Sequence, residues 1–133
     1  MKRFHAIAFT SVLTVLSFNA SSAEFTNSQL CKAAISVEMS KEPSIMKVRE
    51  RGDLVDLQYI RANDGTKWKY QCKIINGDQI MWRTAGDDNT PNRIGRWRDH
   101  PLDSTIKFSI SGNTLTISES ELGDTTFEQS ELK

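Results

Sequence analysis

A change of hydrophobic period at Pro43 limits the fold of this chain more than any other feature. Before it, apolar residues recur at the spacing of one helical face, at Leu30, Ala33, Ala34 and Val37. After it, apolar and polar residues alternate, which is typical of half-buried strands. Because proline has no N–H and a fixed φ, a helix cannot continue through it. The sequence therefore predicts one helix, capped by Asn27 or Ser28, followed by a β region.

Eight short strands are predicted after Pro43, each bounded by a turn signal rich in Gly, Asn, Asp or Pro. Their expected bounds are 45–50, 54–61, 67–75, 79–84, 93–98, 104–110, 114–120 and 125–131. Because the connections are short, neighbouring strands should pair antiparallel as a meander. A small closed barrel and a strongly curved open sheet both fit this pattern. The predicted fold class is α+β, mostly β, with the N-terminal helix packed on the sheet.

Two cysteines, Cys31 and Cys72, are expected to form a disulfide. Cys31 borders the apolar stripe of the predicted helix. Cys72 shares the apolar side of its predicted strand with Trp68, Tyr70 and Ile74, because side chains two residues apart point the same way. The bridge should therefore hold the helix against that face of the sheet.

The turn at Asn76-Gly77 predicts a register for the hairpin that follows. A three-residue loop ending at Gly77, with the glycine in a left-handed bulge, places Cys72 opposite Ile80 and keeps one apolar face continuous. A two-residue loop would instead place Cys72 opposite Met81. The bulged loop is the predicted one.

Residues 1–23 are predicted to be a secretory signal peptide. Lys2 and Arg3 precede an apolar run from Ala6 to Phe18, and small residues suited to cleavage end at Ala23. A membrane-spanning helix needs about 20 apolar residues, and this run is shorter. We therefore expect cleavage and a periplasmic or secreted location; an uncleaved anchor is the alternative.

The expected mature domain, residues 24–133, carries little net charge. Without Lys2 and Arg3 it has 15 basic and 17 acidic residues, a net charge of −2. No strong field therefore attracts it to nucleic acid, and no integral membrane segment remains after cleavage. Residues 47–98 hold eleven basic and seven acidic residues, whereas residues 99–133 hold two basic and seven acidic. This asymmetry indicates either two solvated faces or a basic patch beside an acidic one.

Residues with catalytic chemistry are few. His100 is the one histidine after residue 23, and Asp103 and Ser104 lie close to it in sequence, but no Gly-x-Ser-x-Gly motif is present. One histidine and two bridged cysteines do not make a zinc set, and the spacing of residues 87–89 lacks the alternation of a calcium loop. No metal, no cofactor and no enzymatic activity are predicted.

Residues 85–98 are the strongest candidate binding region. They begin with the longest predicted connection and end with arginine and tryptophan, which are common at protein interfaces. The candidate binding residues are Asp87, Asp88, Arg93, Arg96, Trp97 and Arg98. If Trp97 points into the core, Arg96 and Arg98 point outward and join Lys69 and Lys73 in a basic stripe. Alternatively, Trp97 is only a core residue and the arginines pair with Asp99, Asp103 or Asp64.

Together these features predict an exported, non-enzymatic binding domain, inhibitor- or immunity-like, whose partner is another exported or envelope protein. The first alternative is a small-ligand carrier. Four aromatic side chains would then line a barrel interior: Tyr59, Trp68, Tyr70 and Trp82. The second alternative is a small hydrolase that uses His100.

Overall fold

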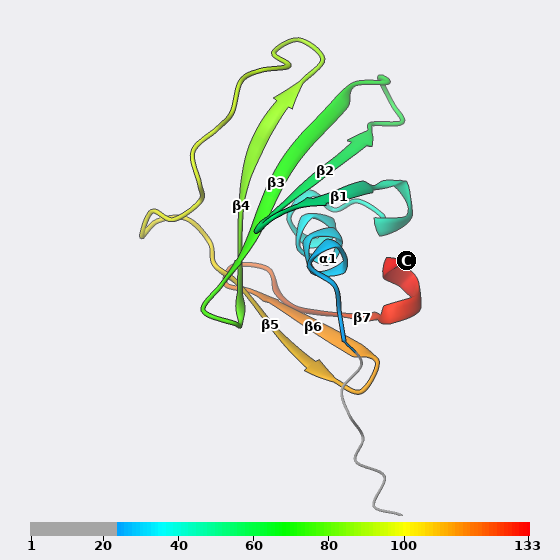
Figure 1. Cartoon of the computed structure of the whole chain (residues 1–133), viewed down its shortest axis with the longest axis vertical. Coiled ribbons are helices and arrows are strands. Elements are labelled where there is room, and N and C mark those ends of the chain that lie inside the picture. The colour runs from blue at the N-terminus through cyan, green and yellow to red at the C-terminus, as the bar shows by residue number, and fades with distance from the viewer. Residues whose placement is uncertain (1–23) are drawn as a thin grey trace, which may run out of the picture.

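A computed structural model describes residues 24–133, in which a seven-stranded antiparallel sheet curves around one helix (Figure 1). The predicted signal peptide lies outside these residues. The helical elements are α1 (Asn27–Met39), the 3-10 turn η1 (Pro43–Ile45) and the 3-10 turn η2 (Gln129–Leu132). The strands are β1 (Lys47–Arg51), β2 (Leu54–Ile60), β3 (Lys67–Ile75), β4 (Gln79–Asp87), β5 (Ile106–Ser111), β6 (Thr114–Glu119) and β7 (Gly123–Glu128).

Helix α1 begins with a capping box at Thr26, so the expected caps Asn27 and Ser28 are wrong. The Thr26 hydroxyl accepts from the Gln29 backbone N–H at 3.1 Å, and the Gln29 side chain accepts from the Thr26 N–H at 3.0 Å. The Ser28 N–H donates to the Glu50 carboxylate of β1 at 3.0 Å. These contacts satisfy backbone donors that the first helical turn leaves free.

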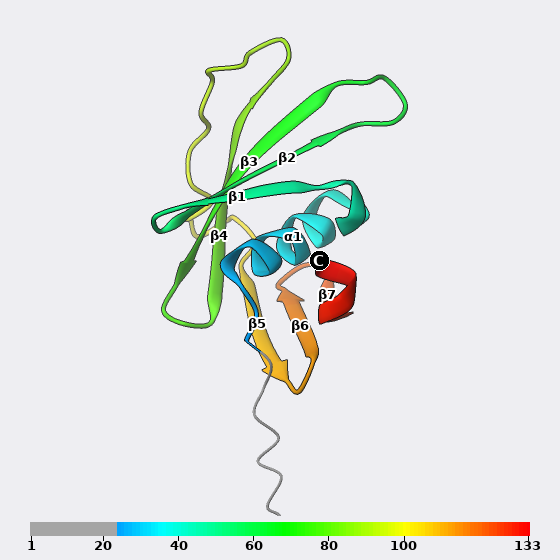
Figure 2. The same ribbon diagram turned by 45° about the vertical axis from the view of Figure 1, so that its right-hand side comes forward.

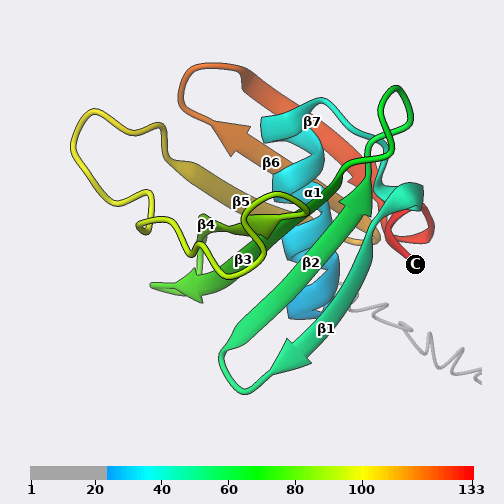
Figure 3. The same ribbon diagram turned by 90° about the horizontal axis from the view of Figure 1, so that it is seen from above.

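The curved sheet buries α1 over more than one face (Figure 3). Besides the predicted stripe, Cys31 and Ile35 have no exposed surface. The opposite wall of this core comes from both halves of the sheet, including Leu57 of β2 and Ile117 of β6. Burying a side chain of this size contributes about 1.5–3 kcal/mol.

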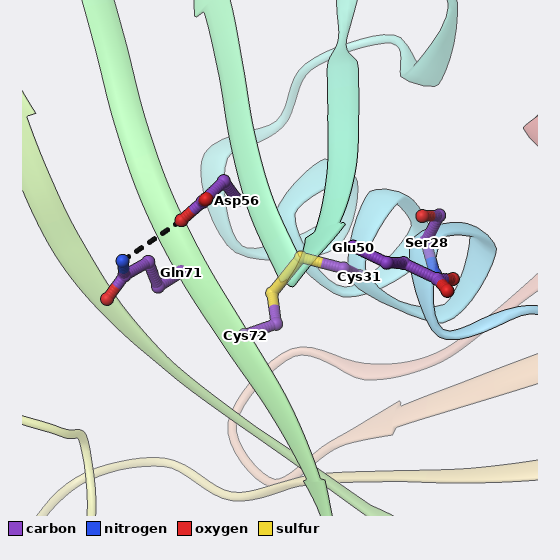
Figure 4. The surroundings of a disulfide bond; sticks show 6 residues. All are labelled: Ser28, Cys31, Glu50, Asp56, Gln71 and Cys72. Atoms are coloured by element: carbon purple, nitrogen blue, oxygen red, sulfur yellow. Dashed lines mark hydrogen bonds between the residues drawn. A yellow bond between two sulfur atoms is a disulfide. The ribbon is translucent and has the colours of Figure 1, made fainter. Parts of the chain in front are cut away.

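The disulfide between Cys31 and Cys72 is confirmed, and it joins α1 to the middle of β3 (Figure 4). Both cysteines are fully buried. No free cysteine remains in the described chain. The bridge thus fixes the helix on the concave side of the sheet, as the two apolar faces predicted.

The sheet is an open, curved meander with strand order β1 to β7. Strands β1 and β7 lie at its two ends. Strands β4 and β5 are joined by two residue pairs, Gln79 with Lys107 and Ile80 with Ile106. The sheet therefore bends between β1–β4 and β5–β7, as Figures 1 and 2 show. No helix of residues 24–133 has the length and apolar character needed to span a bilayer.

The predicted strand 93–98 is wrong, and seven strands form instead of eight. This segment still lies beside β4, because the Gly95 N–H donates to the Thr84 carbonyl at 2.9 Å and the Arg98 N–H donates to the Trp82 carbonyl at 3.0 Å. These two bonds do not form a continuous ladder. The last predicted strand ends early, at Glu128, and the chain continues into η2.

The register predicted for the β3–β4 hairpin is also wrong. Cys72 pairs with Trp82 and not with Ile80, because the three-residue loop begins one residue later, at Asn76. Both Asn76 and Gly77 adopt positive φ, at 54° and 74°. The resulting shift is two residues, which leaves each side chain on its predicted face. The continuous apolar face is therefore preserved.

Candidate functional site

The outer face of β1–β4, which points away from α1, carries basic side chains in three cross-strand rows. From β1 to β4 the rows are Lys47, Gln58, Lys69 and Gly86; Arg49, Asp56, Gln71 and Arg83; and Arg51, Leu54, Lys73 and Met81. Asp56 supplies the one carboxylate of these rows. The sheet therefore collects on one face the basic residues that the sequence spaces two apart.

A chain of polar contacts crosses all four strands at Asp56. Arg51 Nε lies 2.5 Å from Asp56 Oδ2, and Gln71 Nε2 donates to Asp56 Oδ1 at 3.0 Å (Figure 4). Gln71 Oε1 in turn accepts from Arg83 Nε at 2.8 Å. Burial opposes ionisation of Asp56, but these donors outweigh it and hold the pKa of the carboxyl below its usual value. The acid is thus already paired within the sheet.

Trp97 lies on this outer face. Its ring centre is 4.2 Å from Lys73 Nζ and 4.2 Å from Arg83 Cζ, so that two cations contact the ring. The stacking fixes the loop after β4 against the outer face. The predicted core location of Trp97 is therefore wrong, and its role as a binding residue stays a prediction.

The other two side chains of the expected stripe lie elsewhere. Arg98 Cζ is 5.0 Å from the ring centre of Trp82, a core residue on the helix-facing side of the sheet. Arg96 forms a bidentate pair with Asp103, at 2.6 and 2.9 Å. Neither arginine therefore joins Lys69 and Lys73 in the expected basic stripe.

A groove of about 660 Å³ lies on the outer face, between the first two rows and the loop after β4. We call it the basic groove. Its strand side includes Lys47, Arg49 and Lys69, and its loop side includes Pro91, Asn92 and Ile94. Within residues 24–133 no ion pair involves any of the three cations. Asp56, the one carboxylate of the lining, interacts with the charge of Arg49, so three cations and one acid leave the groove with a net positive charge.

Gly86 allows the loop to close over the end of β4. It has a φ of 111°, and a Cβ at this position would lie 2.7 Å from the Pro91 carbonyl oxygen and 2.8 Å from that of Thr90. Any larger residue would push this backbone away. The absence of a side chain at Gly86 thus sets the position of the loop wall.

The two predicted aspartates organise the same loop. Asp87 Oδ1 accepts from the backbone N–H of Asn89 at 2.8 Å and from that of Thr90 at 2.7 Å. The contacts with Thr90 lower the pKa of Asp87. Asp88 accepts from the Lys67 N–H at 2.8 Å. Both carboxylates therefore hold backbone in place, which gives the loop a defined shape.

His100 does not form a relay with its neighbours. Its Nδ1 accepts from the Leu102 N–H at 3.0 Å, and the Asp103 carboxylate accepts from the His100 backbone N–H and not from its ring. The Ser104 hydroxyl donates to Glu38 at 3.4 Å. These bonds close a turn and orient no nucleophile.

A second polar cluster lies on the helix side of the sheet, where Glu38 of α1 faces Glu119 of β6. Burial, followed by the charge of Glu119, raises the pKa of Glu38, although the bond from Ser104 opposes this. The positive charge of Arg98 lowers the pKa of Glu38. The Nε atom of Arg98 is itself buried without a hydrogen-bond partner. In the described part of the chain no three potential metal-ligating side chains cluster, here or elsewhere.

Sequence reasoning missed Lys47 and Arg49 as site residues. A signal for them is present in the sequence, because basic residues alternate at 47, 49 and 51 as side chains on one face of a strand do. The meander places this strand, β1, beside β2, and β2 pairs with the lysine-rich strand β3. Comparisons of the chain with models of protein families, with curated proteins and with solved structures find no match.

Proposed function

We propose that residues 24–133 form a non-enzymatic domain that binds another protein through the basic groove and the loop of residues 88–98. The observation that carries this proposal is the set of cations at Lys47, Arg49 and Lys69, which have no ion pair within the described chain and line a groove beside a braced loop. Leaving charge unpaired gains nothing for folding, whereas complementary charge guides association with a partner.

The loop supports this function because it is shaped before any partner arrives. The contacts of Asp87, Asp88 and Trp97 fix its course, and Arg96 is held by Asp103. Arg93 is exposed and has no ion pair among residues 24–133. In our proposal the predicted binding residues divide accordingly: Arg93 contacts the partner, and the others mainly hold the surface that the partner meets. A pre-organised surface loses less entropy on binding.

The filled core favours a binding site on the surface and argues against an internal ligand site. Three of the four aromatic residues that a carrier would use, Tyr59, Tyr70 and Trp82, are between 3 and 8% exposed and pack in a core that α1 fills. The fourth, Trp68, is partly buried and packs against that core. The disulfide suits an oxidising compartment. We accordingly propose an exported domain, periplasmic or secreted, with a partner in the same compartment.

Photo-crosslinking from the groove wall tests this function. A photoreactive amino acid replaces Ile94, which is 55% exposed, in the full-length protein expressed in its own host. The matched control is Leu122, which is 62% exposed in the β6–β7 turn. We expect a discrete adduct with one protein from position 94 only, reduced by Arg93→Glu. Equal labelling from both positions, or a catalytic turnover that His100→Ala abolishes in the folded protein, would contradict the proposal.

A further inference from the structure

We infer that the basic groove receives a short, extended and acidic segment of the partner protein, which crosses strands β1–β4. Its carboxylates face Lys47, Arg49 and Lys69, and an apolar side chain meets Pro91 and Ile94. This inference rests on the proposed function and names the chemistry of the partner.

The direction of the groove follows from the strand register. Residues of the first row and of the second row both line it, so its floor runs between the rows and across the strands. Rows two residues apart are separated by about 7 Å, and four neighbouring strands span roughly 14 Å. An extended peptide covers that distance with about four residues. The loop wall stands at one end, and Lys47 and Arg49 stand at the other.

The charge of the groove selects an acidic segment. Asp56 also lines the groove and interacts with the charge of Arg49 across β1 and β2, but its carboxylate is bonded to Arg51 and Gln71. One carboxylate therefore faces three cations, and the lining keeps a net positive charge. Carboxylates accept strong hydrogen bonds from lysine and arginine. The side-chain amides of Gln58 and Asn92, which also line the groove, can bond to the backbone of an extended chain.

The same lining argues against a single-stranded nucleic acid. Such ligands bind by stacking bases on exposed aromatic rings. The one aromatic residue of the groove lining, Tyr70, is 3% exposed, and the ring of nearby Trp97 is covered by Lys73 and Arg83. The apolar end at Pro91 and Ile94 instead suits a side chain such as leucine beside the acids.

Selection from a displayed library of random octapeptides tests the inference with the full-length protein as bait. We expect enriched peptides to carry two or more Asp or Glu residues next to an apolar residue. For a synthesised enriched peptide, Lys47→Glu, Arg49→Glu and Lys69→Glu should each weaken binding about tenfold or more. Lys107→Glu is the matched control, an exposed strand lysine in the other half of the sheet, and should change affinity by less than about twofold.

Two outcomes would overturn the inference. One is enrichment of peptides without acidic residues, or no enrichment. The other is competition by a thymidine oligonucleotide as strong as by the peptide, which would indicate a general surface for polyanions. The two proposals can fail separately. If the position-94 adduct survives Lys69→Glu, the domain still binds a protein at its loop, and only the acidic segment in the groove is refuted. If positions 94 and 122 label equally, protein binding by this face is itself refuted.

Discussion

Removing the disulfide between Cys31 and Cys72 should take away a large part of the stability of this domain. The bond joins residues 41 apart in sequence. In the chain-entropy description, closing a loop of this length lowers the free energy of folding by about 4 kcal/mol at 25 °C. Small domains have free energies of unfolding of about 5–15 kcal/mol, so loss of the bond should leave a marginal fold.

Urea unfolding followed by circular dichroism measures this contribution. Three samples are compared: the oxidised protein, the reduced protein, and the variant with Cys31→Ala and Cys72→Ala. Reduction should lower the free energy of unfolding by about 4 kcal/mol. The variant should lose slightly more, because it also removes two sulfur atoms from fully buried positions. The difference in the free energy of unfolding between the reduced protein and the variant gives the packing contribution of the sulfur atoms, separate from that of the cross-link.

A loss below about 1 kcal/mol on reduction would refute this reasoning, since the unfolded chain would then not be restricted by the bond. Thiol titration of the unfolded, unreduced protein gives an independent check. It should find no free thiol, and two titratable thiols would show that the bond does not form.

Three further changes test particular contacts. Gly86→Ala should lower the free energy of urea unfolding by about 1–3 kcal/mol, because the new Cβ would meet the loop backbone. Gly112→Ala, also at positive φ but with open space around the Cβ, should lower it less. Equal losses would contradict the close approach at Gly86. Trp97→Ala should lower the free energy of unfolding by about 1–2 kcal/mol through loss of two cation–π contacts, and no change would show that the stacking is not stabilising. Burial and the charge of Glu119 raise the pKa of Glu38 above 4.5, which means that the folded protein favours the protonated carboxyl. The stabilisation from protonated Glu38 is therefore complete below pH 4.5 and is lost as the pH rises through the raised pKa. Glu38→Gln should therefore stabilise the protein relative to the unmodified chain at pH 7 but not at pH 4, and urea unfolding that finds the same difference at both pH values would contradict this.

The candidate site was only partly predictable. Residues 85–98 stand out in the sequence because a long connection precedes arginine and tryptophan, and this loop forms one wall of the groove. The face occupied by Trp97 was not predictable, because alternation assigns a face only within a regular strand and this segment is not one. Lys47 and Arg49 contribute to the groove only because β1 and β3 both pair with β2.

The sequence by itself determined the helix, most of the strands and the disulfide, because these depend on local periodicity, on turn residues and on the chemistry of two cysteines. Only the tertiary structure decided which residues face one another. Asn76 joined Gly77 in positive φ and moved the pairing of β3 with β4 by two residues, which the apolar pattern tolerates because its period is also two. The basic groove depends on that same pairing and on a glycine that lets the loop close over β4. Such long-range juxtapositions have no local signal, since their energies arise only when the strands meet.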